Sequence, residues 1–382
     1  MAIQVPIIPE TLRWAMNWAN LKEEALAKSL NVRPEKIRHW LNGTEKPTYS
    51  QARKLADLCH IAFSQLLLPP PEQIELPLKD FRRGLKKGNE PSQELVEAVY
   101  DALRKHDWWR EYRRNTPLPF FQNWLSNQYE VETIKQAILQ IIPIQELQRN
   151  ARSWQDFLRL AVEKIEDAGI LVLRQGYVGT NTRRVFDPKE FSGFVIADRV
   201  APIIFLNTQD PLVRQIFTLM HELVHVWIGE SVLDAELEDS HEPDEHLERL
   251  CDQVAAELLM PEADFKNAWN GEPYEQAQRA AKVFKVSAWA TLKRALELNL
   301  ISYDEYAKTL QQIQKNNSKM KQPKGSGNFW LTFEIRNSRK FVRTVLDAAL
   351  CGEISSKEMA SLLNLRLPTA MAFMERSAYV PS

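Results

Sequence analysis

His221 and His225 are four residues apart, and Glu222 directly follows the first. Residues 217–228 contain no proline or glycine, which predicts a helix that ends at Gly229. Residues four apart in a helix differ by about 6 Å in height and about 40° in direction, so both imidazoles can bind one metal ion. Zinc would lower the pKa of a bound water toward ~7, and Glu222 would take its proton as the water attacks a peptide carbonyl.

Two histidines at this spacing also occur by chance in ordinary helices, so the neighbouring residues matter. Most of them are apolar, which predicts a largely buried helix: Phe217, Leu219, Met220, Leu223, Val224 and Ile228. Histidine and glutamate are rarely buried without a partner. A zinc ion would be that partner.

A catalytic zinc site needs a third protein ligand. A second helix, predicted at residues 244–259, offers Glu248 and Asp252 on one face, with Cys251 between them as a small buried residue. Glu257 lies nine positions beyond Glu248, on roughly the opposite face. Spacing alone therefore leaves Glu248 and Asp252 as alternatives.

Residues 217–225, combined with Glu248, Cys251, Asp252 and residues 254–261, resemble the ImmA/IrrE metallopeptidase family. The resemblance is to its longer branch, which carries an amino-terminal helix-turn-helix. It continues upstream through residues 178–184 and 191–194, and it covers most of residues 1–310. It implies Zn²⁺ as the cofactor, Glu248 as the third ligand and a narrow protein substrate, commonly a neighbouring repressor. Family members usually have Asn where this chain has Asp252.

Three further residues are candidate donors to the oxyanion that forms during peptide hydrolysis: His246, Tyr177 and Arg183. His246 is two residues from Glu248. His241 and His246 also flank a strongly acidic stretch at residues 230–248, which we interpret as a solvated surface, and we do not expect either histidine to bind the metal.

The first 68 residues predict a helical domain. Helices are expected at 9–20, 22–30, 34–41 and 50–60, and the second and third are joined by a turn at 31–33. This is the helix-turn-helix arrangement, and it resembles the phage-repressor (XRE) type. Nine basic and six acidic residues give this region a net charge of +3.

The third of these helices should turn its apolar residues, Ile37, Trp40 and Leu41, toward the core. A polar and partly basic surface is left to contact double-stranded DNA: Arg33, Lys36, Arg38, His39 and Asn42. The alternative is an ordinary small helical bundle that binds a protein.

Length and pattern predict a multidomain chain, mainly α, with an α+β catalytic core. We expect a helix-turn-helix bundle at 1–68, a linker and helical connector at 69–150 and a zincin-like peptidase domain with a small sheet at 151–270. A small helical domain at 271–318 and a helical module at 325–382, of net charge +6 over 314–382, complete the chain. Strands are expected at 170–173, 193–197 and 202–207, and any of them could pair with an extended substrate.

Composition places the 382-residue chain among soluble globular proteins, with 44% hydrophobic and 26% charged residues. The net charge of −1 provides no global field for nucleic acid. No apolar run reaches the ~20 residues of a membrane span, and no signal peptide is recognised. Three scattered cysteines favour a reducing cytoplasm.

These observations predict a cytoplasmic, DNA-binding zinc metalloendopeptidase. Its partners would be double-stranded DNA and a specific regulatory protein encoded nearby, and no membrane. The alternative is a transcriptional regulator, such as the antitoxin of a toxin-antitoxin pair, whose peptidase-like domain binds a toxin and cuts little or nothing. An intact Glu222 favours the enzyme, because a binding protein has no need of that carboxylate.

Overall fold

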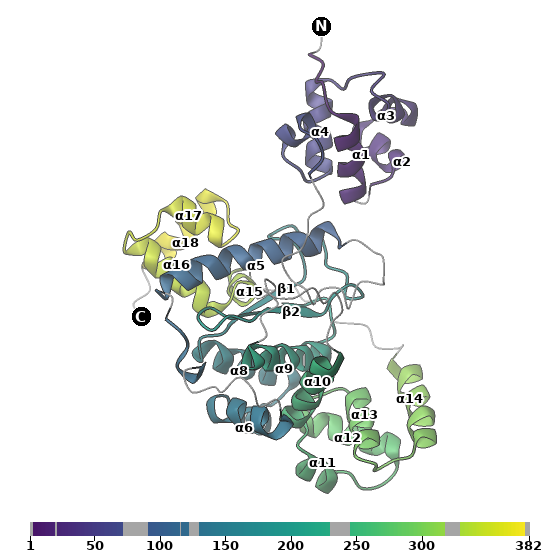
Figure 1. The fold of residues 1–382 in the computed structure, drawn as a ribbon, viewed down its shortest axis with the longest axis vertical. Helices are drawn as coiled ribbons and strands as arrows, with labels where there is room; N and C mark the ends of the chain where they lie inside the picture. Colours follow the sequence, from purple (N-terminus) through teal and green to yellow (C-terminus); the bar gives the residue numbers. More distant parts are fainter. Residues whose placement is uncertain are drawn as a thin grey trace. The chain divides into compact units, whose positions relative to one another are not determined.

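The computed structural model describes residues 3–19, 21–71, 91–114, 116–121, 130–229, 245–317 and 329–378. These residues are mostly helical with one three-stranded sheet, which confirms the predicted α-rich fold (Figure 1). The chain divides into two compact units: Met1–Leu76 with Glu90–Val96, and Pro77–Asn89 with Glu97–Ser382. The finer predicted boundaries stay predictions. None of the helices in the described ranges is long and apolar enough to cross a membrane.

Several predicted features lie outside the described residues. They are most of the linker (72–90), most of the acidic stretch including His241 (230–244), and the first residues of the carboxy-terminal module (325–328).

The first unit contains the four predicted helices, each within two residues of its expected bounds, and one additional 3-10 helix. They are α1 (Pro9–Trp18), α2 (Glu23–Leu30), α3 (Pro34–Leu41), α4 (Tyr49–Leu58) and η1 (Phe63–Leu67). Proline at the first position starts α1 and α3. Thr48 starts α4, because its side chain accepts from the amide of Gln51 while the Gln51 side chain accepts from the Thr48 amide.

The turn between α2 and α3 begins at Asn31, which adopts a left-handed conformation (φ 54°) and ends α2. Ile37 and Trp40 of α3 are fully buried with Leu12, Leu26 and other apolar residues of this unit. The helix therefore turns the predicted apolar side to the core. Its assignment as a DNA-binding helix remains a prediction.

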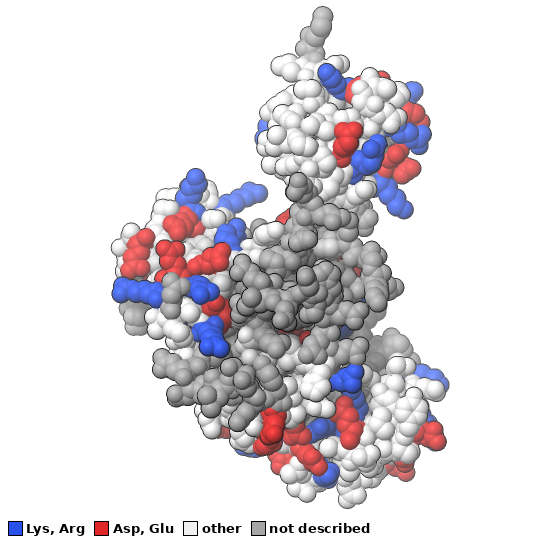
Figure 2. All heavy atoms as spheres, viewed as in Figure 1, with Lys and Arg blue, Asp and Glu red and all other residues white. Residues whose placement is uncertain are grey.

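On the outer face of α3, two of the five candidate DNA contacts pair with acidic side chains of the same unit. Arg38 Nε donates to Glu23 Oε2 (2.9 Å), and His39 Nδ1 lies 3.0 Å from Glu45 Oε1. The hydrogen bond and charge of Glu23 raise the pKa of the Arg38 guanidinium. Figure 2 accordingly shows basic and acidic groups side by side on this unit, so its visible face carries no single-sign patch.

The second unit is built on a sheet of order β1-β3-β2. β1 (Leu171–Gln175) is parallel to β3 (Ile203–Asn207), with Leu171 opposite Ile203, and β2 (Gly193–Ile196) is antiparallel to β3. All five residues of the central strand are buried, because helices cover both faces of the sheet. This order makes β1 and β2 the edge strands.

Helices α8 (Trp154–Asp167) and α9 (Leu212–Ile228) cover one face of the sheet, and α5 (Gln93–Tyr112) and α15 (Phe329–Arg336) lie on the other (Figure 1). Helix α9 packs on β2 and β3 and ends, as predicted, at Gly229, which has a φ of 68°. Helices α6 (Val131–Ile141) and α10 (Glu245–Leu259) pack against α9, and α7 (Ile144–Asn150) packs against α10. Helix α7 has no counterpart in the sequence analysis.

A group of four helices follows α10: α11 (Glu262–Ala268), α12 (Pro273–Phe284), α13 (Ala288–Glu297) and α14 (Tyr303–Asn317). Ser287 caps α13 by accepting from the amide of Ala290 (3.0 Å). The core of this group is continuous with that of the sheet and α9, so these helices are packed into the second unit.

The predicted carboxy-terminal helical module contains α15, α16 (Arg339–Leu350), α17 (Ser356–Leu362) and α18 (Leu367–Ala378), whose individual bounds the sequence analysis did not give. Arg336 donates to Tyr177 Oη (2.9 Å), and its guanidinium lies 4.2 Å from the centre of that ring. Arg339 pairs with Glu163 of α8 (2.8 Å). This module therefore packs against β1, Tyr177 and α8 of the second unit.

Candidate metal centre

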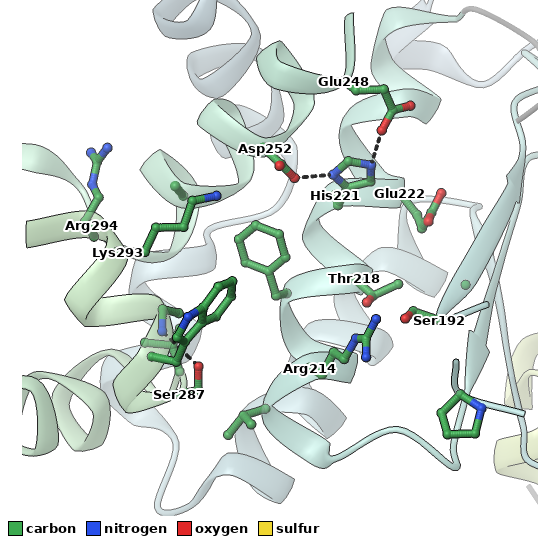
Figure 3. Close-up of a pocket in the computed structure, with 18 of the residues that line it drawn as sticks. Ser192, Arg214, Thr218, His221, Glu222, Glu248, Asp252, Ser287, Lys293 and Arg294 are labelled. Carbon is green, nitrogen blue, oxygen red and sulfur yellow. Dashed lines mark hydrogen bonds and ion pairs between the residues drawn. The ribbon is translucent and has the colours of Figure 1, made fainter. Parts of the chain in front are cut away.

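Helix α9 provides the floor of a cavity of about 880 Å³. Seven of its residues face the cavity at the helical steps expected of one face: Val213, Arg214, Phe217, Thr218, His221, Glu222 and His225. Figure 3 shows Thr218 and Glu222 on the side of the floor next to the sheet, near Ser192, while Lys293 and Arg294 of α13 lie on the opposite side. The cavity is thus a groove between β2 and α13.

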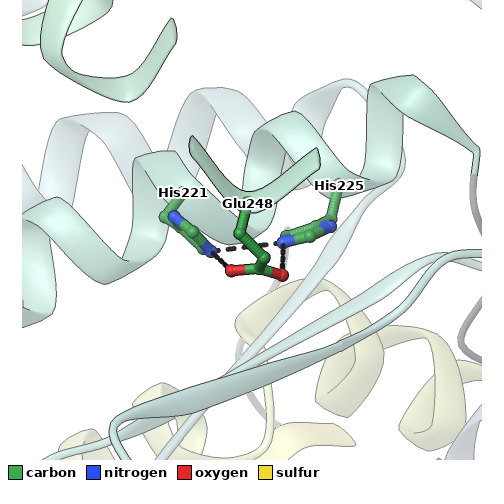
Figure 4. Close-up of side chains that lie close together, drawn as sticks. All are labelled: His221, His225 and Glu248. Atoms are coloured by element: carbon green, nitrogen blue, oxygen red, sulfur yellow. Dashed lines mark hydrogen bonds and ion pairs between the residues drawn. The ribbon is translucent and has the colours of Figure 1, made fainter. Parts of the chain in front are cut away.

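His221, His225 and Glu248 converge at this floor (Figure 4). His221 Nε2 lies 3.3 Å from Glu248 Oε2, and His225 Nε2 lies 3.2 Å from Glu248 Oε1. The two Nε2 atoms are 3.2 Å apart. The residues come from two helices, α9 and α10, which pack against each other. Among the described residues this is the group of His, Cys, Asp and Glu that could hold a metal ion.

The spacing of these atoms fits a metal ion. Ligand atoms bound at about 2.0–2.1 Å to a tetrahedral zinc ion are roughly 3.3 Å from one another. The carboxylate of Asp252 lies 3.0 Å from His221 Nδ1, so this nitrogen is the donor. With a neutral imidazole, Nε2 of His221 then points a lone pair at the carboxylate of Glu248. A cation among the three groups would turn this repulsion into attraction.

The group is also buried in the way that a metal site requires. The side chain of His225 is 4% exposed and that of Glu248 is 9% exposed, whereas that of Asp252 at the rim is 47% exposed. Sγ of the fully buried Cys251 lies 3.8 Å from His225 Nδ1, outside the three-residue group. Buried ionisable groups of this kind are normally paired with a charge or a metal.

Glu222 lies on the neighbouring side of α9 and lines the cavity. The strand β2 approaches the helix very closely there, because Gly193 has no side chain. A Cβ on Gly193 would be 2.6 Å from Thr218 Cγ2 and 2.7 Å from the Phe205 carbonyl oxygen, and 3.5 Å from Glu222 Oε1. Glycine therefore allows the edge strand to lie directly beside the carboxylate.

The three candidate oxyanion donors do not line this cavity. Tyr177 is engaged by Arg336 of α15, Arg183 is exposed in the loop between β1 and β2, and His246 is exposed near the start of α10. The structure therefore does not bring these side chains to the metal group. Their positions depend on how a loop and the first turn of a helix are oriented, which residue type and spacing do not reveal.

Other cavity residues were missed in the sequence because they carry no catalytic signature. The wall opposite β2 is formed by α13 and α14 and includes Trp289, Ala290, Leu310 and Ile313. These residues read as core positions of a small helical domain. Trp289 was the available signal, because tryptophan is enriched at binding surfaces.

The chain is similar to a known metallopeptidase domain over its central part. Residues 165–296 match the Peptidase_M78 family model, described as the IrrE N-terminal-like domain. The match spans the sheet, the two helices with the metal group, and α12 and α13. It supports the resemblance to the ImmA/IrrE family that the motifs indicate, and the helices of the first unit lie outside it. The search of curated proteins found no match.

Proposed function

We propose that the protein is a zinc-dependent peptidase, with His221, His225 and Glu248 as the metal ligands. The single observation that carries this proposal is the convergence of two imidazole nitrogens and one carboxylate at 3.2–3.3 Å. When bound, zinc would lower the pKa of a water molecule and polarise the peptide carbonyl.

The chain's own residues would do the rest of the work. Glu222 takes the proton from the attacking water and passes it to the leaving amine. Asp252 accepts the hydrogen of His221 Nδ1, which holds the imidazole in the orientation that leaves Nε2 for the metal. The edge strand β2, held against α9 through Gly193, would bind the substrate as an extended segment by backbone pairing.

Metal content and activity test this proposal with matched variants. Freshly purified protein should contain about one zinc per chain, His225→Ala should lose it, and Glu222→Gln should keep it while losing cleavage. His246→Ala is the control, because this histidine is on α10 but outside the cavity. Cleavage is measured by co-expression with the protein encoded next to it, which we propose as the substrate. Absence of a transition metal from the wild-type protein would rule the proposal out.

We further propose that the first unit binds double-stranded DNA through α3. The helices α2 and α3, joined by a three-residue turn, support this reading. Arg38 and His39 already pair with Glu23 and Glu45, so they should contribute less to DNA binding than Lys36 does. Lys36→Ala should therefore reduce binding to promoter DNA more than Arg38→Ala, and each lost phosphate contact should lower the salt slope by about one.

The regulatory role follows from these two activities together. A protease with a DNA-binding head would act on a specific regulatory protein at the same promoter, since tethering raises the local concentration of both. None of the three cysteines forms a disulfide, which supports a reducing compartment such as the cytoplasm. If Glu222→Gln neutralises a neighbouring toxin as well as the wild type does, the antitoxin function is the correct one.

A further inference from the structure

The cavity wall opposite the edge strand carries an apolar patch with an exposed indole. Trp289 is 48% exposed although it lies on α13 within a folded unit. Val286, Leu310 and Ile313 line the same cavity from the turn before α13 and from α14, and Phe217 lines it from the floor. Tryptophan at a cavity surface supplies a large contact area for a bound group.

The wall is fixed to the helix that carries the metal ligand. Arg294 of α13 pairs with Glu257 of α10, and both side chains are largely buried. Thr291 of α13 donates to the Ala277 carbonyl (3.0 Å), and Trp154 Nε1 donates to the Val286 carbonyl (3.2 Å). The wall and the metal group therefore share one rigid support, which is what a selective subsite needs.

The charges on this wall balance one another. Lys293 Nζ lies 3.7 Å from Glu297 Oε1, and both residues line the cavity. Arg294 is occupied by Glu257. A charged substrate group would lose water here without gaining a dedicated partner, whereas an apolar group would remove the indole surface from water.

We propose that this wall is a specificity subsite for a large apolar side chain of the substrate, such as leucine, methionine or phenylalanine, with Trp289 as its main contact. The inference rests on the proposed peptidase function. Phe217 lies one helical turn, about 6 Å, before His221. An extended chain covers that distance in about two residues, so the apolar side chain lies within about two residues of the cleaved bond.

The test uses metal-chelating probes, so that binding is measured separately from cleavage. Three succinyl hydroxamates differ in one substituent: isobutyl, carboxymethyl or hydrogen. Affinity for the zinc-loaded full chain is measured by calorimetry. The isobutyl compound should bind about tenfold tighter than the unsubstituted one, the lower end of what burial of one such group gives. The carboxymethyl compound should gain nothing.

Variants assign the effect to the indole. Trp289→Gln should reduce the isobutyl preference to about twofold or less, and Trp289→Phe should keep most of it. Tyr303→Ala is the matched control, because Tyr303 is an exposed aromatic residue of α14 that does not line the cavity. Each variant is first shown to retain one zinc.

The possible outcomes test the subsite and the peptidase function separately. Equal binding of the isobutyl and unsubstituted compounds, or an unchanged preference in Trp289→Gln, would overturn the subsite while leaving the peptidase proposal intact. Tighter binding of the carboxymethyl compound would also overturn it. If no hydroxamate binds the zinc-loaded protein, the metal is closed to ligands, and the proposed function falls together with the subsite.

Discussion

Replacing Glu257 by glutamine tests whether the buried ion pair between α10 and α13 holds the second unit together. The pair joins Glu257 to Arg294, whose side chain is 7% exposed. Glu257 Oε2 also lies 3.5 Å from Lys135 of α6. The substitution keeps the size and one acceptor of the side chain but removes the charge that faces a buried guanidinium.

The expected loss of stability is large because the partner charge stays buried. Breaking one side of a buried pair costs about 3–5 kcal/mol. Lys135 retains Glu132 as a partner (2.5 Å), and Arg294 retains the more distant Glu297 (3.9 Å). The loss should therefore be at the lower end, about 3 kcal/mol. The unit has roughly 300 residues, and an unfolding entropy of about 2.1 cal/mol/K per residue converts this loss into a fall in melting temperature of roughly 5 °C.

Scanning calorimetry of the chelator-treated protein measures this shift without a contribution from metal binding. Glu262→Gln is the control, because the Glu262–Lys266 pair is exposed and screened by solvent, so its loss should leave the melting temperature nearly unchanged. The double variant Glu257→Leu with Arg294→Met removes both charges and should recover most of the loss. If Glu257→Gln melts within 2 °C of the wild type, this account of the α10–α13 contact is wrong.

Three other predictions follow from named contacts. Asp252→Ala should weaken zinc binding about tenfold in chelator competition, whereas Asp252→Asn should keep most of the affinity, since an amide oxygen can still accept from His221. Burial alone would raise the pKa of Asp198, but the nearby imidazole of His106 and hydrogen bonds from the backbone amides of Val200 and Ala201 lower it to about 2. At pH values above the unfolded pKa of about 4, ionised Asp198 should therefore add about 2 kcal/mol to the free energy of unfolding. This contribution is lost as the pH falls toward about 2. Urea unfolding of Asp198→Asn should show a correspondingly smaller pH dependence than that of the wild type. A thiol reagent should label the exposed Cys351 in the native protein. It should label Cys59 only after unfolding, because this thiol is buried and burial raises its pKa to about 12.

The helical period was enough to place His221 and His225 on one face of α9, but not to choose the third member of the candidate metal group. His221 and His225 share a face in any helix. Glu248 and Asp252 also share a face, and the sequence left both open. The crossing of α10 over α9 decides between them: Glu248 faces both Nε2 atoms, while Asp252, one turn later, reaches Nδ1 of His221.

The sheet and the carboxy-terminal module show where local patterns fail. The three strands were recognisable as apolar runs. No local pattern, however, indicates that β3 lies between β1 and β2 in the sheet. Helix α15 was missed because residues 329–335 are almost continuously apolar and show no helical period. Tyr177 was one candidate oxyanion donor in the sequence, and no local pattern indicates that Arg336, 159 residues later, donates to its hydroxyl group.

The cavity-lining residues of α9 also set the length of the substrate segment that can lie along the cavity floor. Val213 and His225 are twelve residues apart, which is about 18 Å along the helix, or five to six residues of extended chain. A target bound along this floor has to release that many residues from its own helices and strands. Cleavage would then depend on how often the target opens locally, and a partner that holds the same segment folded would protect it. The timing of the cut would be decided by the state of the target, with no change in the protease.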